Sequence, residues 1–262
     1  MSYNDIHLVD TYRNTIQDSL NFPYLDWRRT MSRIVWDNLG DHFYENGVDH
    51  CVLYPVSTTG TYPSGVAWNG ITSISESPSG ADANKQWADN INYLTLYGAE
   101  EFGATIEAFT YPDEFAECDG SATLVPGVVV GQQPRRGFGL CYRTKVGNDT
   151  IGQDYAFKIH LIYGCRAAPS DRSYETINDS PDPITFSWEI STTPVAVPNH
   201  NPSAQIVIDS RDFTSTNGQK ALNDFLDILY GTDATTGTNA QTETTARLPL
   251  PAEVIEKLTY TD

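Results

Sequence analysis

Two stretches of alternating residues decide the fold: Phe138-Gly-Leu-Cys-Tyr-Arg-Thr-Lys-Val146 and Tyr155-Ala-Phe-Lys-Ile-His-Leu-Ile-Tyr163. Alternation of apolar and polar residues is the pattern of half-buried β-strands, because successive side chains point to opposite faces of a sheet. The segment between them, Gly147-Asn-Asp-Thr-Ile-Gly152, consists largely of residues that favour turns. The sequence therefore predicts an antiparallel hairpin.

The same alternation recurs elsewhere in the chain. Ile184-Thr-Phe-Ser-Trp-Glu-Ile190 alternates without a break, and we expect Phe186 and Trp188 to face the core. Strands at this spacing are typical of sandwiches and barrels, so the fold class is predicted to be mainly β, with a β-sandwich or barrel-like body. The further strands are expected at roughly 51–56, 66–75, 91–97, 104–111, 124–130 and 204–209.

One flanking helix and one short C-terminal helix are expected beside the strands. The first is predicted from about Gly218, with Gly231 placed to end it. The second begins at Pro251, with Ile255 and Leu258 on its apolar side. The residues that recur at helical spacing in the first helix are Leu222, Phe225, Leu226 and Leu229.

The chain is predicted to hold one domain, residues 31–262, preceded by an N-terminal arm. Residues 1–30 show weak helical periodicity and no strand alternation. Within the domain, residues 231–247 are rich in Thr and low in apolar residues, which predicts a flexible linker before the last helix.

The formal charge of −18 over 262 residues argues against a basic surface that holds nucleic acid. The charge is also uneven, since residues 76–119 carry a net −9 and residues 132–172 a net +4. We therefore expect a subunit with poles of opposite sign. No run of 18 apolar residues occurs and the first residues lack a secretion-signal pattern, so neither a membrane span nor a membrane partner is expected.

No catalytic residue, cofactor site or metal site is predicted. The four cysteines, Cys51, Cys118, Cys141 and Cys165, lack zinc-site spacing and are expected to be reduced structural thiols. His160 lies within a predicted strand and is expected to be a sheet residue. Residues 82–89 alternate oxygen-bearing side chains as in a calcium loop, but a Trp stands where the loop requires Gly, which favours a polar hairpin tip.

The stretch Tyr111-Pro-Asp-Glu-Phe-Ala-Glu-Cys-Asp-Gly120 places four carboxylates and a thiol close together. Paired carboxylates serve glycosidases and metal-assisted hydrolases. However, Pro112 can start a single helical turn, acids near its N-terminus are favoured by the helix dipole, and Gly120 can end it. A structural turn is therefore predicted, and a hydrolase that uses Glu114, Glu117 or Asp119 is the least favoured alternative.

Several longer strings, in order along the chain, resemble the major tail tube proteins of siphophages that infect Gram-positive bacteria. The resemblance runs from about Met31 to the C-terminus. The strings are WDNLGDHFYENGVDHCVLYP, GVAWNG, YGAEEFGATIEAFTYPDEFAECDG, YRTKVGNDT, INDSP, FSWEISTTPVAVP and RLPLPAEVIEKL. Residues 1–30 depart from the pattern, so Met31 is a candidate initiator and the arm before it is expected to be dispensable.

This resemblance implies a structural virion protein rather than an enzyme. Its subunits would close into hexameric rings, and the rings would stack into a tube that DNA traverses without specific binding. The partners implied are other copies of the chain, a tape measure protein, and tail terminator and distal tail proteins. The location implied is the virion tail, after assembly in the host cytoplasm.

Three sets of residues are predicted to serve such an assembly. Residues 76–91 are expected to form an extended loop or hairpin for contacts between rings, since long polar loops are usually functional. The acids Glu100, Glu101 and Glu107 are expected to line the lumen, because an acidic wall keeps DNA from adhering. The remaining ring-contact candidates are Trp87 as the anchor, Asp82 and Lys85 in the same loop, and Asp113, Glu114, Glu117 and Asp119 at a ring edge facing Arg135 and Arg136.

A β-sandwich domain that binds carbohydrate or a receptor is the main alternative. Five Trp and fifteen Tyr would supply stacking surfaces for sugar rings. The inward position expected for Trp188 weakens this interpretation.

Overall fold

The computed structural model describes residues 36–80, 82–177, 179, 182–234 and 243–261. The chain divides into two compact units, Met1–Asn38 and Leu39–Asp262. In the first unit the described residues, 36–38, form no helix or strand. The predicted N-terminal arm, residues 1–30, lies outside the described residues. Residues 235–242 of the predicted linker 231–247 also lie outside them.

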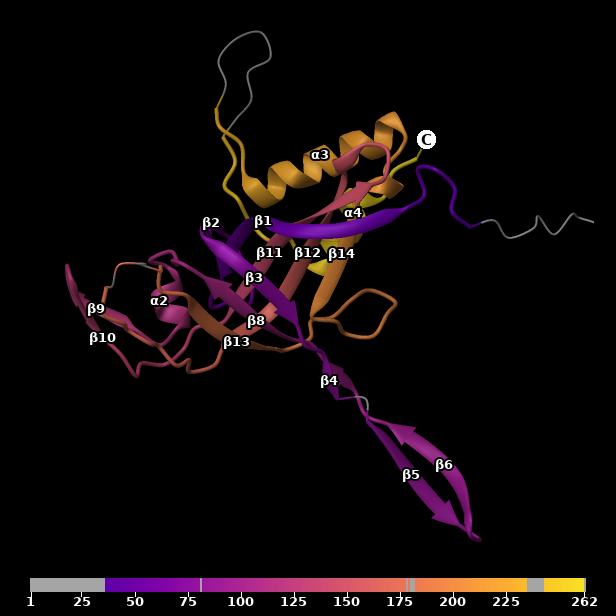
Figure 1. The fold of residues 1–262 in the computed structure, drawn as a ribbon, viewed down its shortest axis with the longest axis horizontal. Coiled ribbons are helices and arrows are strands. Elements are labelled where there is room, and N and C mark those ends of the chain that lie inside the picture. Colours follow the sequence, from indigo (N-terminus) through magenta and orange to yellow (C-terminus); the bar gives the residue numbers. More distant parts are fainter. Residues whose placement is uncertain (1–35, 81, 178, 180–181, 235–242, 262) are drawn as a thin grey trace, which may run out of the picture. The chain divides into compact units, whose positions relative to one another are not determined.

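An eight-stranded antiparallel sheet forms the body of the second unit (Figure 1). Its strand order is β2-β1-β11-β12-β13-β8-β3, and β14 pairs with β12. The mainly β prediction is therefore confirmed. The strands are β1 (Phe43–Pro55), β2 (Val66–Ala67), β3 (Ile71–Glu76), β8 (Gly103–Ala108), β11 (Phe138–Asn148), β12 (Gly152–Ala167), β13 (Phe186–Thr192) and β14 (Gln205–Asp209).

The predicted central hairpin is formed by β11 and β12. Tyr142 lies opposite His160 and Thr144 opposite Lys158 in its antiparallel register. The turn is held by Asn148, whose side-chain oxygen accepts hydrogen bonds from the backbone N–H groups of two following residues, that of Ile151 at 2.7 Å. β12 continues to Ala167, beyond the predicted end, and so pairs with β14 along its middle and with β13 near its end.

Both faces of the β11–β12 pair are buried over residues 138–142 of β11 and 159–163 of β12. Leu140 and Tyr142 on β11 belong to a first core that also contains Trp188 and Ile106. Cys141, between them, belongs to a second core, in agreement with the period of two along a strand. The first core lies between β11–β12 and the strands β13 and β8. Trp188 is 1% exposed, which confirms its predicted inward position.

Two helices cover the second core. α3 (Thr216–Tyr230) buries Leu222, Phe225 and Leu229, and α4 (Pro251–Leu258) buries Val254. Ser215 caps α3 by accepting a hydrogen bond from Gly218 N at 3.1 Å, so the helix begins two residues before the predicted start. Gly231, at φ +77°, ends the helix as predicted.

The predicted apolar side of α4 was partly wrong. Ile255 is 44% exposed, whereas Pro251 and Val254 are buried and Leu258 is half-buried. Pro251, Val254 and Leu258, spaced by three and four residues, form the face that packs against the second core, and Ile255 lies at the edge of that face.

Two predicted strands are each broken in two. Residues 66–75 form β2 and β3, separated at Gly70, whose φ of +81° is a conformation that ends regular pairing. Residues 124–130 form most of a small ribbon of β9 (Ala122–Val125) and β10 (Val128–Val130), joined by a turn at Gly127 with φ +84°. The remaining strands are β4 (Ser79–Gly80), β5 (Ala83–Ala88), β6 (Ile91–Tyr97) and β7 (Glu100–Glu101).

The acidic stretch at 111–120 contains a single helical turn, α2 (Phe115–Cys118), as predicted. Phe115 is fully buried, and its ring centroid lies 4.5 Å from that of Trp68 and 5.1 Å from that of Trp188. The carboxylates of Glu114 and Glu117 remain exposed. The turn therefore places an aromatic ring in the first core and leaves Glu114 and Glu117 at the surface, whereas the Asp119 side chain is 8% exposed.

Replacing Phe115 tests this structural role. We expect Phe115→Ala to lower the free energy of unfolding by about 3–5 kcal/mol, because it leaves a cavity among aromatic rings. Glu114→Ala in the same turn is the control and should change that free energy by less than about 0.5 kcal/mol. Urea unfolding monitored by circular dichroism measures both. Equal, small effects would show that α2 is not part of the core.

Candidate assembly surfaces

β5 and β6 form a two-stranded hairpin that is connected to the body through β4 and β7 (Figure 1). Asp89 and Asn90 form its turn with φ values of +50° and +62°. Two successive positive φ values favour Asn and Asp and match the twist of a β-hairpin. The predicted hairpin at 76–91 is confirmed, but its end is wrong, because residues 91–97 form its returning strand.

Every residue of β5 is exposed, and so is every residue of β6 except Thr95. Trp87 is 68% exposed and Tyr97 72%. An isolated two-stranded hairpin is only marginally stable in water, and exposed apolar clusters mark interaction sites. We name residues 83–97 the apolar hairpin. Its exposed large apolar side chains are Trp87, Ile91, Tyr93, Leu94, Leu96 and Tyr97.

Both faces of the apolar hairpin carry these side chains. Leu96 lies opposite Asn84 on one face, whereas Tyr97 lies opposite Ala83 on the other. A register shift next to Trp87 marks a β-bulge. Trp87 thus lies on a strand, two residues before the turn, and not at a loop tip as predicted.

The three lumen candidates are not brought together as one group. Glu100 and Glu101 form β7, which pairs with β4 at the base of the hairpin, and both are exposed. Glu107 lies on β8 of the main sheet, where its carboxylate accepts a hydrogen bond from Ser73 Oγ at 2.9 Å. The sequence showed only that all three flank one predicted strand.

The outward face of β3, β8 and β13 is polar and carries few charges. Glu107 lies between Ser73 and Ser187, and Thr105 lies between Ser75 and Glu189. The alternate residues of β8, such as Ile106, are buried in the first core. One base shares this face at the edge of the group, since Arg166 on β12 is exposed opposite Ser191.

Two of the four predicted ring-edge acids, Glu117 and Asp119, form ion pairs with bases of the same chain. Glu117 Oε2 lies 2.9 Å from Arg136 Nη1. Asp119 Oδ1 lies 3.5 Å from Arg135 Nη1, and its other oxygen pairs with Arg172. These contacts connect α2 to the segment after β10. The other ring-contact candidates, Asp113, Glu114, Asp82 and Lys85, are exposed.

Glu76 ties the base of the hairpin to three other strands. It is the last residue of β3, directly before the chain enters β4. Its Oε1 accepts hydrogen bonds from the Tyr142 hydroxyl on β11 and from Gln205 Nε2 on β14, the latter at 3.0 Å. His160 Nδ1 on β12 lies 3.3 Å from the same oxygen. The Glu76 carboxylate therefore contacts β11, β12 and β14 at the point where the chain leaves the sheet toward the hairpin.

His160 has partners that the sequence did not reveal. Its ring stacks on Tyr142 with centroids 4.6 Å apart, and its Nε2 lies 3.1 Å from Thr144 Oγ1. The side chain is nearly buried, and this desolvation lowers the pKa of His160 below its ordinary value. The prediction of a sheet residue is confirmed; Tyr142 and Thr144 lie on the neighbouring hairpin strand β11, whereas Glu76 comes from β3, which is remote in sequence.

The β9–β10 ribbon is a second exposed apolar surface, which we name the valine ribbon, residues 122–130. Leu124, Val125, Val128 and Val129 are all exposed. β9 and β10 pair only with each other among the described strands. No ionisable residue occurs from Gly120 to Pro134. The ribbon therefore presents apolar side chains without neighbouring charge in the sequence.

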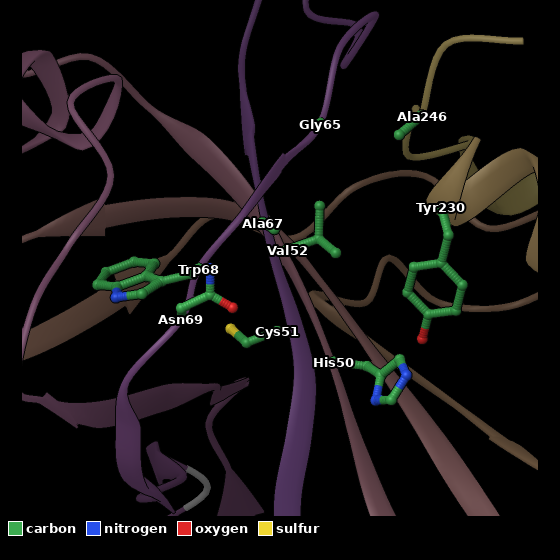
Figure 2. A pocket seen from close by; sticks show the side chains of 9 residues that line it. All are labelled: His50, Cys51, Val52, Gly65, Ala67, Trp68, Asn69, Tyr230 and Ala246. Carbon is green, nitrogen blue, oxygen red and sulfur yellow. The ribbon is translucent and has the colours of Figure 1, made fainter. Parts of the chain in front are cut away.

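A pocket of about 500 Å³ lies beside β1 and β2 (Figure 2). Figure 2 shows Trp68 on one side and the rings of His50 and Tyr230 on the other. The carboxylate partner of His50, Asp49, is already held by Arg143 in two bonds of 2.7 and 2.8 Å. Burial raises the pKa of the Cys51 thiol, so it stays protonated near neutral pH and is a poor nucleophile.

All four cysteines are free and buried. Burial raises the pKa of the Cys118 and Cys141 thiols to about 12. The described residues contain no group of three His, Cys, Asp or Glu side chains that is arranged to hold a metal ion. Among the described helices, none is both long and apolar enough to span a membrane.

Comparisons with known proteins give structural matches only. No protein-family model matches the chain, and no curated protein matches it. A chain in the cryo-EM structure of the anti-feeding prophage baseplate aligns with a TM-score of 0.32 at 8% identity, over 67% of this chain and 97% of that one.

Two further matches come from an extracellular contractile injection system, PVC, in its extended state. A chain of the sheath–tube complex has a TM-score of 0.27 at 11% identity, over 61% of this chain and 88% of that one. A chain of the sheath/tube terminator has the same TM-score and identity, over 63% and 97%. TM-scores of this size do not establish a shared fold.

The contacts of Glu76 predict how firmly the hairpin base is held. We expect Glu76→Gln to speed amide exchange about tenfold at Ser77, whose N–H donates to Gly103 O at 2.8 Å. A hydrogen bond to a charged group contributes about 1.5 kcal/mol, and 1.4 kcal/mol corresponds to a factor of ten. Hydrogen exchange at residue resolution measures the change. Asp154→Asn, which removes an exposed carboxylate paired with Lys145, is the control. Unchanged exchange at Ser77 would show that Glu76 does not hold the base.

Proposed function

We propose that this chain is a structural subunit of a siphophage-type tail tube, built from stacked rings that conduct DNA. The resemblance of its sequence to major tail tube proteins supports this assignment, and the rings are taken to be hexameric on that basis. The observation that carries the proposal is the apolar hairpin. Its large side chains are exposed in the single chain and need a partner surface.

The physical reason is the cost of leaving these side chains in water. Burial of a large apolar side chain contributes about 1.5–3 kcal/mol, and the hairpin exposes six of them. The hairpin buries none of them against the main sheet, so the favourable burial has to come from another molecule. Contacts between rings would supply it, with Trp87 as an anchor because Trp is enriched among residues that dominate interface energy.

Electron microscopy of the purified chain tests the assembly. We expect the wild type to form rings and tubes at high concentration, and Trp87→Ala to shorten or abolish the tubes while the monomer stays folded. Val207→Ala, at an exposed position on β14, is the control and should leave tube length unchanged. A wild-type chain that stays monomeric and binds glycans would instead support the carbohydrate-binding alternative.

We further propose that the outward face of β3, β8 and β13, with Glu107, lines the lumen together with Glu100 and Glu101. Small hydroxyl groups and carboxylates would offer DNA few attractive contacts. Acidic groups would also repel its phosphates over about a Debye length, roughly 10 Å at 0.1 M salt. DNA would then pass without specific binding, while the tape measure, terminator and distal tail proteins would contact the tube. Assembly would take place in the host cytoplasm and end in the virion tail.

Charge reversal tests the lumen assignment. We expect tubes carrying Glu100→Lys, Glu101→Lys and Glu107→Lys to assemble and to retain DNA, since attraction to many phosphates adds up along the strand. The control carries Asp224→Lys, Asp227→Lys and Glu256→Lys on α3 and α4, which change the net charge equally. Electrophoretic mobility of DNA mixed with each kind of tube is the measurement. Equal DNA retention by both variants would place the three acids outside the lumen.

A further inference from the structure

We propose that the valine ribbon is the surface on which the apolar hairpin of the next copy docks. The inference rests on the proposed function, since it assumes that copies of this chain stack, and it names the two surfaces that meet. A head-to-tail contact joins two different patches of the same molecule, so each copy must carry both. The hairpin and the ribbon are two such patches.

The scarcity of charge favours this pair of surfaces. Within residues 83–97 the apolar hairpin carries two charged side chains, Lys85 and Asp89, and from Gly120 to Pro134 the ribbon segment carries no ionisable group. Charged residues are depleted at interface cores, because each buried charge has to be paired after it loses its water. The two patches can therefore meet with few charges to pair or to leave in water.

A third exposed apolar group, formed by two aromatic rings, fits the hairpin less well. Phe43 and Tyr155 contact each other with centroids 5.4 Å apart and are both exposed. However, the Arg211 guanidinium lies 5.0 Å from the Phe43 ring, and the Lys145–Asp154 ion pair lies on the neighbouring strands. Docking an apolar surface there would remove water from these charges.

The strand pairing of both patches also favours contact between the hairpin and the ribbon. Each is a two-stranded sheet whose outer edges have no partner among the described strands. Two strands alone are marginal in water, whereas three or more strands with an apolar face are stable. A hairpin of one copy placed beside the ribbon of another would satisfy free backbone groups and cover apolar side chains at once.

A mixing experiment with two assembly-defective variants tests the pairing. Trp87→Asp damages the hairpin and Val129→Asp damages the ribbon, at positions that are 68% and 59% exposed. The control is Ile151→Asp, at a 64% exposed position in the β11–β12 turn. Circular dichroism checks that each variant is folded, and Leu124→Asp replaces Val129→Asp if the latter does not fold. Multi-angle light scattering measures the particle mass.

We expect each variant alone to stop at one unstacked unit, whether ring or monomer. Each variant keeps one intact patch, so an equimolar mixture should form particles of twice that mass with one unit of each. The control should stack like the wild type.

A mixture no larger than its components, or normal stacking by Val129→Asp, would overturn the inference. Doubling by Val129→Asp alone would show hairpin-to-hairpin contact, and doubling by Trp87→Asp alone would show ribbon-to-ribbon contact. If the wild type does not assemble, the proposed function fails, and the inference fails with it.

Discussion

The β11–β12 pair is the part of the structure on which the rest depends, because both of its faces are buried over residues 138–142 and 159–163. Leu140 and Tyr142 pack into the first core, while Cys141 and Leu161 pack into the second beneath α3. Where the pair is enclosed in this way it has no face left for a partner molecule, whereas its end near the turn, with Asp154 and Tyr155, is exposed. Surfaces for assembly therefore have to lie on strands that cover only one core, or on segments that extend away from the main sheet.

The exposed features of the chain follow this rule. The outward side of β8 alternates with its buried side, so the polar face that carries Glu107 lies directly behind the first core. The apolar hairpin and the valine ribbon are segments that extend away from the main sheet, and each pairs only within itself among the described strands. Glu76 connects the apolar hairpin to the main sheet, since its carboxylate holds the base of the hairpin to β11 and β14.

Local patterns predicted the elements, whereas remote contacts had to come from the structure. Alternation located β11, β12 and β13, and Gly231 and Pro251 correctly marked helix ends. The stretch Ile91-Asn-Tyr-Leu-Thr-Leu-Tyr97 has apolar residues at both odd and even positions, which indicates a strand with two apolar faces, but the sequence does not show that this strand lies outside the main sheet. The pairing of Glu117 with Arg136 agrees with the expectation that these acids face Arg135 and Arg136, whereas the contact of His160 with Glu76 joins distant segments that no spacing rule brings together.

Hydrogen exchange of the β5 and β6 backbone amides, compared between dilute monomer and assembled particles, tests the central claim most directly. If the apolar hairpin is exposed only until another copy covers it, its amides should exchange rapidly in the monomer and become protected on assembly. Amides of β11 and β12 should be protected in both states, because two cores already enclose them. Hairpin amides that exchange as fast in assembled particles as in the monomer would contradict the claim.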